Sequence, residues 1–387
     1  MSSIKKFEKP LGMRDTFPLT YEKIERVRQT GRKFFRSRGF DFLETPTLEY
    51  YDTVGKASAI SDASLFKLVD SQGNTLVLRP DMTTPITRVA TSKLLKEKIP
   101  LRLAYSANVF RAQKMEGGRP AEFGQMGIEI IGDKSVFADA EVIIAAIHLM
   151  KEFGIESFKL TIGHAGVLHD ILDDYTDSKD QKEKLRNLLV ERNYVGFEEA
   201  VEQFDLPVTK SNALLQFINE ATNSASIEAM EKYVRKNDGL EYMKQLSKII
   251  EDSDLSEYVS FDFTLSSHMN YYTGMLFEIF AYGSGFPVGS GGRYDGLLHL
   301  FGCDVGATGF SIRTNRLLEV LPEYEEQEET VCIIFDEDGF SKALAVATDL
   351  RQQGARVTIQ SRSGLINEEA FTKLFSRVVY VSQEEGQ

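Results

Sequence analysis

Residues 125–129, in the stretch EFGQMGIEIIG, combine side chains that could bind a free amino acid. A β-strand places every second side chain on the same face, so Gln125 and Glu129 would share one face with Gly127 between them. An amide carbonyl or a carboxylate can hold an ammonium group, and the glycine would leave space for a ligand. The pattern indicates an amino-acid site on one face of a strand.

Three other segments supply groups that such a site would need. Asp81 and Thr83 follow a loop-like Arg-Pro pair, Arg111 ends the neighbouring predicted strand, and Tyr271 and Tyr272 add two phenols. A cation, an anion and hydroxyl groups are the set that a free amino acid requires. The alternative is that Gln125 and Glu129 form the solvent-exposed face of an edge strand and that Arg111 pairs with either of them, as surface charges usually do. Spacing alone leaves both interpretations open.

Two amphipathic helices are expected in the first half of the chain. Apolar residues recur at helical spacing from Thr20 to Arg38, with Thr20 as the expected N-cap and Gly39 as the stop. A second helix is expected from Ser135 to Phe153. Each helix has one apolar side, as helices that pack on a core do.

Strand patterns occur on both sides of a long helical stretch. A hairpin is expected in residues 65–83, with its turn at Gln72-Gly73-Asn74. Single strands are expected in residues 102–111, 122–132, 271–283 and 307–312. The glycine cluster GSGGRYDGLL could mark a tight turn, close packing or a ligand loop. Because neither group of strands is large enough for its own sheet, one antiparallel sheet built from both is the simplest interpretation.

The chain is therefore expected to fold as an α+β protein with several parts. An antiparallel sheet with flanking helices would comprise residues 1–167 and 259–321, and a charge-rich helical insertion would occupy residues 168–258. An acidic linker, residues 322–329, would lead to a small α/β module of residues 330–387. Three short apolar runs in that module, separated by two helical segments, predict a β-α-β-α-β unit with parallel strands.

Composition narrows the classes of function. The chain has 387 residues, 58 of them acidic and 45 basic, and its net charge of -13 disfavours binding of a long polyanion such as a nucleic acid. The sequence shows no signal peptide and no membrane-spanning apolar run, so a cytoplasmic protein is expected. Cys303, Cys332 and the scattered histidines lack the spacing of a metal site. We expect no metal and no cofactor.

Six motifs, taken in order, resemble those of one family. They read LGMRDTFP, LRPDMTTP, VFRAQKMEGGRPAEFGQMGIEIIG, NYYTGMLFEIF, GSGGRYDGLL and GFSIRTNRLLEVL. Together they are similar to the successive motifs of histidyl-tRNA synthetase, a class II aminoacyl-tRNA synthetase, over about residues 8 to 321. The resemblance implies that family's antiparallel catalytic sheet.

The resemblance also implies a histidine pocket. Its residues would be Asp81, Thr83, Arg111, Gln125, Glu129, Tyr271 and Tyr272. The amino group of histidine would be held by Asp81, Thr83 and Gln125. Arg111 would lie near the carboxylate, and Glu129 with a tyrosine would read the imidazole. Asp81 stands where the family usually has glutamate, so its side chain is one methylene shorter.

Departures from the family pattern predict that synthetase activity is lost. In a synthetase the tyrosine pair follows Arg-Gly-Leu-Asp, whose arginine helps form the adenylate, whereas residues 267–270 here read Ser-His-Met-Asn. Loss of a preorganised cation beside a developing phosphate charge typically costs ~10²–10³ in rate. Gln113 replaces a carboxylate expected near the adenine. Arg313 stands where a small residue is usual, and Asn315 loses a charge, while Arg316 is kept.

The C-terminal module is too short for a complete anticodon-binding domain. A chain that keeps a histidine pocket but lacks these groups resembles the regulatory subunits of ATP phosphoribosyltransferase, which are similar to histidyl-tRNA synthetase. The resemblance implies a non-catalytic subunit that joins a short catalytic subunit, is needed for its activity, and forms a dimer within a hetero-octamer. L-histidine would be the effector of feedback inhibition in the first step of histidine biosynthesis. No tRNA and no membrane would be partners.

Two alternatives stay open on the sequence. A divergent but active histidyl-tRNA synthetase would catalyse histidine-dependent exchange of pyrophosphate into ATP. An interaction module that no longer uses the pocket would not be stabilised by histidine against thermal unfolding.

Overall fold

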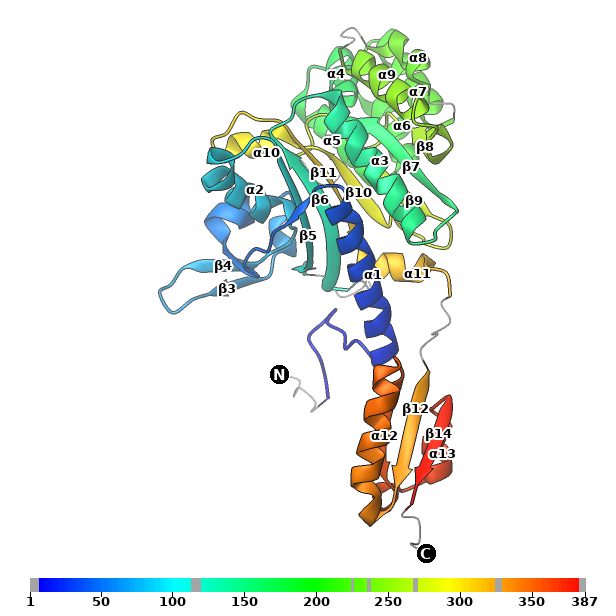
Figure 1. Ribbon diagram of the computed structural model, residues 1–387. Helices are drawn as coiled ribbons and strands as arrows, with labels where there is room; N and C mark the ends of the chain where they lie inside the picture. The colour runs from blue at the N-terminus through cyan, green and yellow to red at the C-terminus, as the bar shows by residue number, and fades with distance from the viewer. Residues whose placement is uncertain are drawn as a thin grey trace, which may run out of the picture. The chain divides into compact units, whose positions relative to one another are not determined.

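The computed structural model describes residues 7–112, 120–223, 226–234, 238–266, 271–323 and 329–382 (Figure 1). Contacts between Cα atoms divide the chain into two units, Met1–Pro322 and Glu323–Gln387. Most of the expected acidic linker, residues 324–328, lies outside the described residues. The residues expected to bind a ligand all belong to the first unit.

The first unit is built on an eight-stranded sheet. Neighbouring strands run antiparallel except for the pairs β1–β5 and β7–β8. Strands from before and after the helical stretch share this sheet, so the predicted α+β fold with one sheet built from both sides is confirmed. In spatial order the strands are β1 (Asp41–Phe42), β5 (Leu101–Phe110), β6 (Glu122–Ile131), β11 (Ala307–Arg313), β10 (Gly289–Arg293), β9 (Met275–Ala281), β7 (Phe158–His164) and β8 (Val259–Phe261).

The glycine cluster forms strand β10 inside the sheet and not a turn. A Cβ atom at Gly291 would lie 2.5 Å from the carbonyl oxygen of Gly309 on the adjacent strand, and one at Gly289 would lie 2.7 Å from that of Ser311. Close packing, one of the possibilities that the sequence left open for this cluster, is therefore the reason for its glycines.

Helices α1 (Pro18–Ser37) and α3 (Val136–Glu152) pack on one face of the sheet (Figure 1). The prediction of Thr20 as N-cap is wrong, because α1 begins at Pro18, whose fixed φ suits the first helical turn, and Phe17 is the N-cap. Gly39, with φ +77°, follows the C-cap of α1 as predicted.

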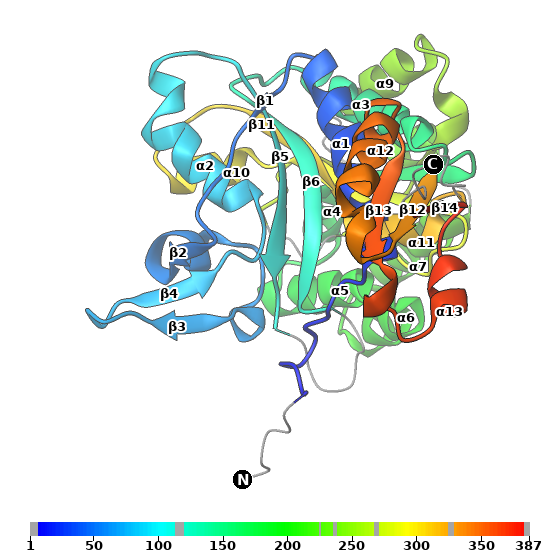
Figure 2. The same cartoon turned by 60° about the horizontal axis from the view of Figure 1, so that its bottom comes forward.

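The opposite face of the sheet carries helices α2 (Thr83–Ser92) and α10 (Asp295–Leu300). The predicted hairpin forms part of a small second sheet of β2 (Leu48–Tyr50), β4 (Thr75–Leu78) and β3 (Lys67–Val69), and it projects from the large sheet (Figures 1 and 2). Its turn is held by Asp70, whose carboxylate accepts hydrogen bonds from the N–H groups of Gln72 and Asn74 at 2.8 and 2.9 Å.

The charge-rich stretch folds into helices, as its periodicity predicts. Their apolar sides belong to the same buried cluster as α1, α3 and the sheet, so this segment shares its core with the sheet. The helices are α4 (Ala165–Tyr175), α5 (Lys179–Val190), α6 (Tyr194–Gln203), α7 (Val208–Asn223), α8 (Ile227–Met230) and α9 (Asp238–Glu251). Helix α11 (Thr314–Val320) follows the last strand of the sheet.

The second unit has its own small core. Strands β13 (Arg356–Ser361) and β14 (Arg377–Val381) both pair in parallel with β12 (Thr330–Phe335), which confirms the predicted parallel unit. Helices α12 (Phe340–Gln352) and α13 (Glu368–Thr372) connect the strands. Val331, Ile333 and Ala343 are among the residues of its core.

Candidate functional site

Glu129 is the centre of a buried polar cluster on the α2 side of the large sheet. Its side chain is 2% exposed; Oε1 accepts a hydrogen bond from Thr83 Oγ1 at 2.9 Å, and Oε2 accepts one from the hydroxyl of Tyr294 at 2.7 Å. Gly309 faces Glu129 on β11, and a Cβ atom there would lie 1.9 Å from Oε2. Burial raises the pKa of Glu129 to about 8, although the two hydrogen bonds oppose the shift.

Asp81 lies immediately before α2 and is fully buried. Its Oδ2 accepts a hydrogen bond from Ser58 Oγ at 2.7 Å, and its Oδ1 accepts one from the N–H of Thr84 in the first helical turn at 2.8 Å. A carboxylate at the N-terminus of a helix is stabilised by the free N–H groups there. These two hydrogen bonds therefore hold the carboxylate of Asp81 in place, although its side chain is one methylene shorter than glutamate.

Arg111 brings a cation to the same region. Its Nε donates a hydrogen bond to the carbonyl oxygen of Pro80 at 2.9 Å, and its guanidinium lies 5.4 Å from the ring centroid of Phe123. Burial lowers the pKa of Arg111, and the charge of Asp81 is the largest effect opposing that shift. The charge of Asp81 thus favours the charged form of Arg111 in this buried region.

Four tyrosines enclose Glu129. The ring centroids of Tyr271 and Tyr272 are 5.0 Å apart, and those of Tyr271 and Tyr294 are 5.9 Å apart, both in edge-to-face geometry. Burial raises the pKa of all four phenols, those of Tyr105, Tyr271, Tyr272 and Tyr294. Their hydroxyl groups therefore keep their protons and can donate hydrogen bonds.

Gln125 is 6% exposed and only half satisfied. Its Nε2 donates a hydrogen bond to Ser311 Oγ at 2.8 Å, whereas its Oε1 has no donor within reach in the part of the chain that the structure describes. A buried carbonyl oxygen without a donor is costly for the fold. Such an atom is positioned to accept a hydrogen bond from a bound molecule.

The structure thus brings together the residues predicted from the sequence, and it adds others. We call them the Glu129 cluster: Asp81, Thr83, Tyr105, Arg111, Gln125, Glu129, Tyr271, Tyr272 and Tyr294. Tyr105 and Tyr294 were not among the site residues predicted from the sequence. Tyr294 follows the glycine strand within a quoted motif. A Cβ atom at Gly127 would lie 2.8 Å from the hydroxyl of Tyr105, so that tyrosine takes the space expected for a ligand.

The positions that depart from the synthetase pattern are described only in part. Gln113 and Ser267-His268-Met269-Asn270 lie outside the described residues. The guanidinium of Arg313 lies 5.1 Å from the ring centroid of Phe123. Arg316 donates a hydrogen bond from Nη1 to the carbonyl oxygen of Pro287 at 2.6 Å, so it contacts the loop before β10.

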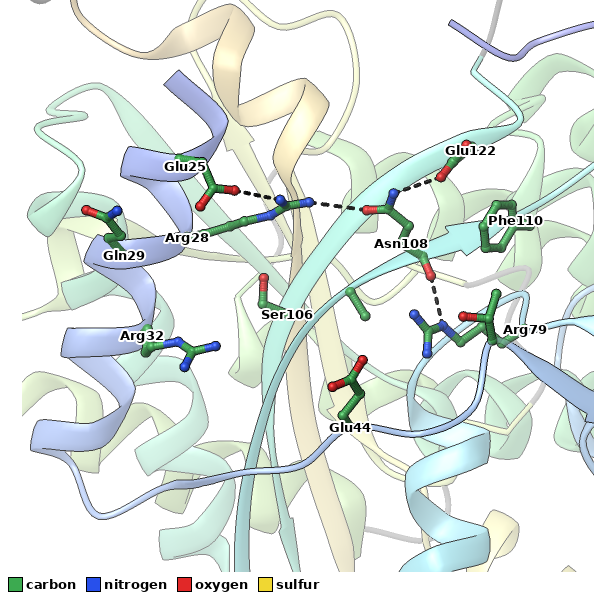
Figure 3. Close-up of a pocket in the computed structure, with 12 residues that line it drawn as sticks. Glu25, Arg28, Gln29, Arg32, Glu44, Arg79, Ser106, Asn108, Phe110 and Glu122 are labelled. Atoms are coloured by element: carbon green, nitrogen blue, oxygen red, sulfur yellow. Dashed lines mark hydrogen bonds and ion pairs between the residues drawn. The ribbon is translucent and has the colours of Figure 1, made fainter. Parts of the chain in front are cut away.

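A cavity of about 640 Å³ lies on the other side of β5, between that strand and α1 (Figure 3). Arg28 of α1 donates hydrogen bonds to Glu25 Oε1 at 2.7 Å and to Asn108 Oδ1 at 3.4 Å, and Asn108 donates to Glu122 Oε1 at 2.8 Å. Arg79 Nε donates to the carbonyl oxygen of Asn108 at 2.9 Å. The seven residues predicted to bind a ligand do not line this cavity.

Residues 7–382, apart from the gaps in that range, contain neither a metal site nor a membrane-crossing helix. No group of three or more His, Cys, Asp or Glu side chains there could hold a metal ion. No helix of the described residues is both long and apolar enough to cross a membrane. Cys303 and Cys332 are free thiols.

Comparison with known proteins gives two family matches. Residues 12–317 match the family described as histidyl-tRNA synthetase, and residues 332–382 match the one described as "Histidyl-tRNA synthetase HisZ, C-terminal domain". A curated relative from Lysinibacillus sphaericus, named ATP phosphoribosyltransferase regulatory subunit, is 66% identical over 380 residues, which cover 98% of this chain and 99% of the relative.

Solved structures agree with the family matches. The crystal structure of an ATP phosphoribosyltransferase regulatory subunit/histidyl-tRNA synthetase from Bacillus halodurans has a TM-score of 0.89 and 41% identity, and the match covers 98% of this chain and 99% of that one. Histidyl-tRNA synthetase from Nostoc has a TM-score of 0.77 at 18% identity, with coverage of 95% and 89%. At that identity the second match shows only the shared fold.

Proposed function

This chain belongs to the family of ATP phosphoribosyltransferase regulatory subunits, which share the histidyl-tRNA synthetase fold, and from that premise we propose that its Glu129 cluster binds L-histidine as a feedback inhibitor. The family name assigns the chain a regulatory and not a catalytic role. Its proposed partner is the short catalytic subunit, which needs this chain for activity in the first step of histidine biosynthesis.

The chemistry of the cluster supports histidine as the ligand. Asp81 and the unsatisfied Oε1 of Gln125 are acceptors for an ammonium group, and Arg111 is a cation for a carboxylate. Glu129, flanked by phenols, can bind a ring that carries N–H groups. The single observation that carries the proposal is the buried Gln125 Oε1, which has no donor in the described residues and lies on the same face of β6 as the buried Glu129. A buried acceptor without a donor is costly unless a ligand uses it.

Inhibition requires that histidine binds one conformation of the complex more tightly than another. Coupling free energies of this kind are typically ~1–3 kcal/mol, which corresponds to a 5–150-fold effect. One binding site per regulatory chain is enough for such an effect. The partner subunit would then change between more and less active states as the amino acid binds.

The proposed assembly follows the family resemblance. Two copies of this chain would form a dimer, and dimers would join catalytic subunits in a hetero-octamer located in the cytoplasm. The net charge of -13 supports a role without tRNA, since a polyanion would be repelled on average. Native mass spectrometry of the copurified complex tests the stoichiometry, and a mass that excludes four copies of each chain would contradict it.

A titration of the complex with histidine tests the proposed site. Glu129→Ala should abolish inhibition, while a control variant at the exposed Glu156, Glu156→Ala, should be inhibited as the wild type is. Thermal melting of both variants establishes that they fold. Unchanged inhibition in a folded Glu129→Ala protein would remove this cluster from the mechanism, and failure of histidine to raise the melting temperature would favour a module with an unused site.

A further inference from the structure

The surroundings of Glu129 contain one other acid, Asp81, and neutral hydroxyl groups. From the start of α2, Thr83 donates to one carboxylate oxygen; from the end of β10, Tyr294 donates to the other. The charge of Glu129 in turn raises the pKa of Tyr105 on β5 and of Tyr272, so both phenols stay protonated nearby. The nearby charge of Asp81 disfavours a second negative charge.

Arg111 is the cation of the cluster, and among the neighbouring groups Asp81 has the largest effect on its charge. Arg111 interacts electrostatically with Asp81, Tyr271 and Tyr272, and the effects that determine the protonation of Glu129 are burial, Thr83, Tyr294 and Asp81. Within the part of the chain that the structure describes, Glu129 is therefore a buried carboxyl group whose partners are uncharged donors and a like charge. Such a group is most stable in its uncharged, protonated form until a cation reaches it.

A histidine ligand arrives at neutral pH with its ring mostly uncharged, since the reference pKa of imidazole is ~6.5. Neither ring nor carboxyl group then has to lose the water shell of a full charge before they meet. Once they are in contact, opposite charges attract strongly in a buried site. The two hydroxyl donors already point at the carboxylate oxygens at 2.9 and 2.7 Å and would stabilise its negative charge.

We propose that Glu129 is a proton donor to its ligand: its protonated carboxyl group transfers the proton to a ring nitrogen of neutral histidine, and the bound state is an imidazolium–carboxylate pair. One O–H bond breaks and one N–H bond forms, and no other reactant takes part. This inference rests on the proposed binding of histidine at the Glu129 cluster. This proton transfer makes the basicity of the ligand's ring, in addition to the shape of the ring, a determinant of specificity.

Nuclear magnetic resonance of ring-¹⁵N-labelled histidine bound to the full chain, or to its complex with the catalytic subunit, tests the proposal at pH 8. Free histidine has a neutral ring at this pH, and the bound ligand should show two protonated ring nitrogens. In Glu129→Gln the bound ring should stay neutral. A neutral ring on histidine bound to the wild type would overturn the proton transfer alone, whereas no binding at all would overturn both this inference and the proposed function.

Two further measurements do not depend on the Glu129 variant folding. Infrared difference spectra of the wild type should lose a protonated-carboxyl C=O band when histidine binds. The isosteric analogue with a weakly basic 1,2,4-triazole ring should bind the wild type at least ~10-fold more weakly than histidine, because it cannot take up the proton. Equal affinity of the two ligands, or an unchanged carboxyl band, would contradict the proposal.

Discussion

Arg293 and Asp139 form a buried ion pair in which Arg293 Nε lies 2.9 Å from Asp139 Oδ2. The same carboxylate oxygen accepts a hydrogen bond from the hydroxyl of Tyr242 in α9. Arg293 immediately precedes Tyr294, which binds Glu129. Of these two consecutive residues, Tyr294 contacts the candidate ligand site. Arg293 is connected to the helical segment through Asp139 of α3, which also accepts a hydrogen bond from Tyr242.

Tyr242→Phe should weaken the attachment of α9 to α3. A hydrogen bond to a charged partner contributes ~1.5–3 kcal/mol, so we expect a loss of that order in the free energy of unfolding, measured with urea. Tyr282, which is 87% exposed, offers the matched control Tyr282→Phe. Equal effects of the two changes would show that the Tyr242 hydroxyl contributes nothing specific.

Gln125→Leu should separate binding from stability. The change removes Oε1, which has no donor in the described residues, and also the hydrogen bond from Nε2 to Ser311. The net loss in the free energy of unfolding should therefore be below ~2 kcal/mol, whereas the affinity for histidine should fall at least ~10-fold. Asn315 also has a buried side-chain oxygen without a donor in the described residues, so Asn315→Leu is the control. Calorimetric titration should find near-normal affinity in that control. Normal affinity in Gln125→Leu would exclude Gln125 as a ligand contact.

The protonation of Glu129 should make stability depend on pH. Its pKa is raised from 4.5 to about 8 in the folded chain, so between these values the folded state holds a proton that the unfolded state has released. Stability of the wild type should therefore fall relative to Glu129→Gln by at most ~1.4 kcal/mol per pH unit as the pH rises from about 5 to 8, and should change little above that.

Denaturant unfolding of both proteins at pH 5.5, 7 and 8.5 measures this difference. Other titrating groups, such as Asp139, occur in both chains and cancel in the comparison. A difference that is constant with pH would mean that Glu129 is ionised throughout this range.

Amino-acid activation should be at least ~10² slower than in an active synthetase. The reason is the serine at position 267, which cannot supply the cation that stabilises the developing phosphate charge. Histidine-dependent exchange of labelled pyrophosphate into ATP measures the step, with a histidyl-tRNA synthetase as the positive control. Exchange at the rate of that control would make the chain an enzyme.

The strands and some residues of the candidate site could be predicted from the sequence where the signal is local. The sequence pattern predicted strands at the positions of β5 and β6. The two-residue period of a strand also predicted that Gln125 and Glu129 share one face. The start of α1 was misplaced because a polar residue, Thr20, resembled a cap, whereas Pro18 sets the first turn.

The remaining site residues depend on register, which the sequence does not reveal. Tyr105 lies opposite Gly127 because β5 and β6 pair at that position, and Tyr294 reaches Glu129 because β11 lies between β10 and β6. A shift of one residue in either pairing would turn these side chains to the other face. The tyrosines could therefore be found only from the folded sheet.

The helical segment is the connection between two parallel strands, since β7 ends at its start and β8, which pairs in parallel with β7, begins at its end. Parallel neighbours cannot be joined by a tight turn and need a crossover of a dozen or more residues. The segment therefore cannot be excised, because without a crossover β8 would have no route back to the edge of the sheet, and its helices also share the core of the sheet.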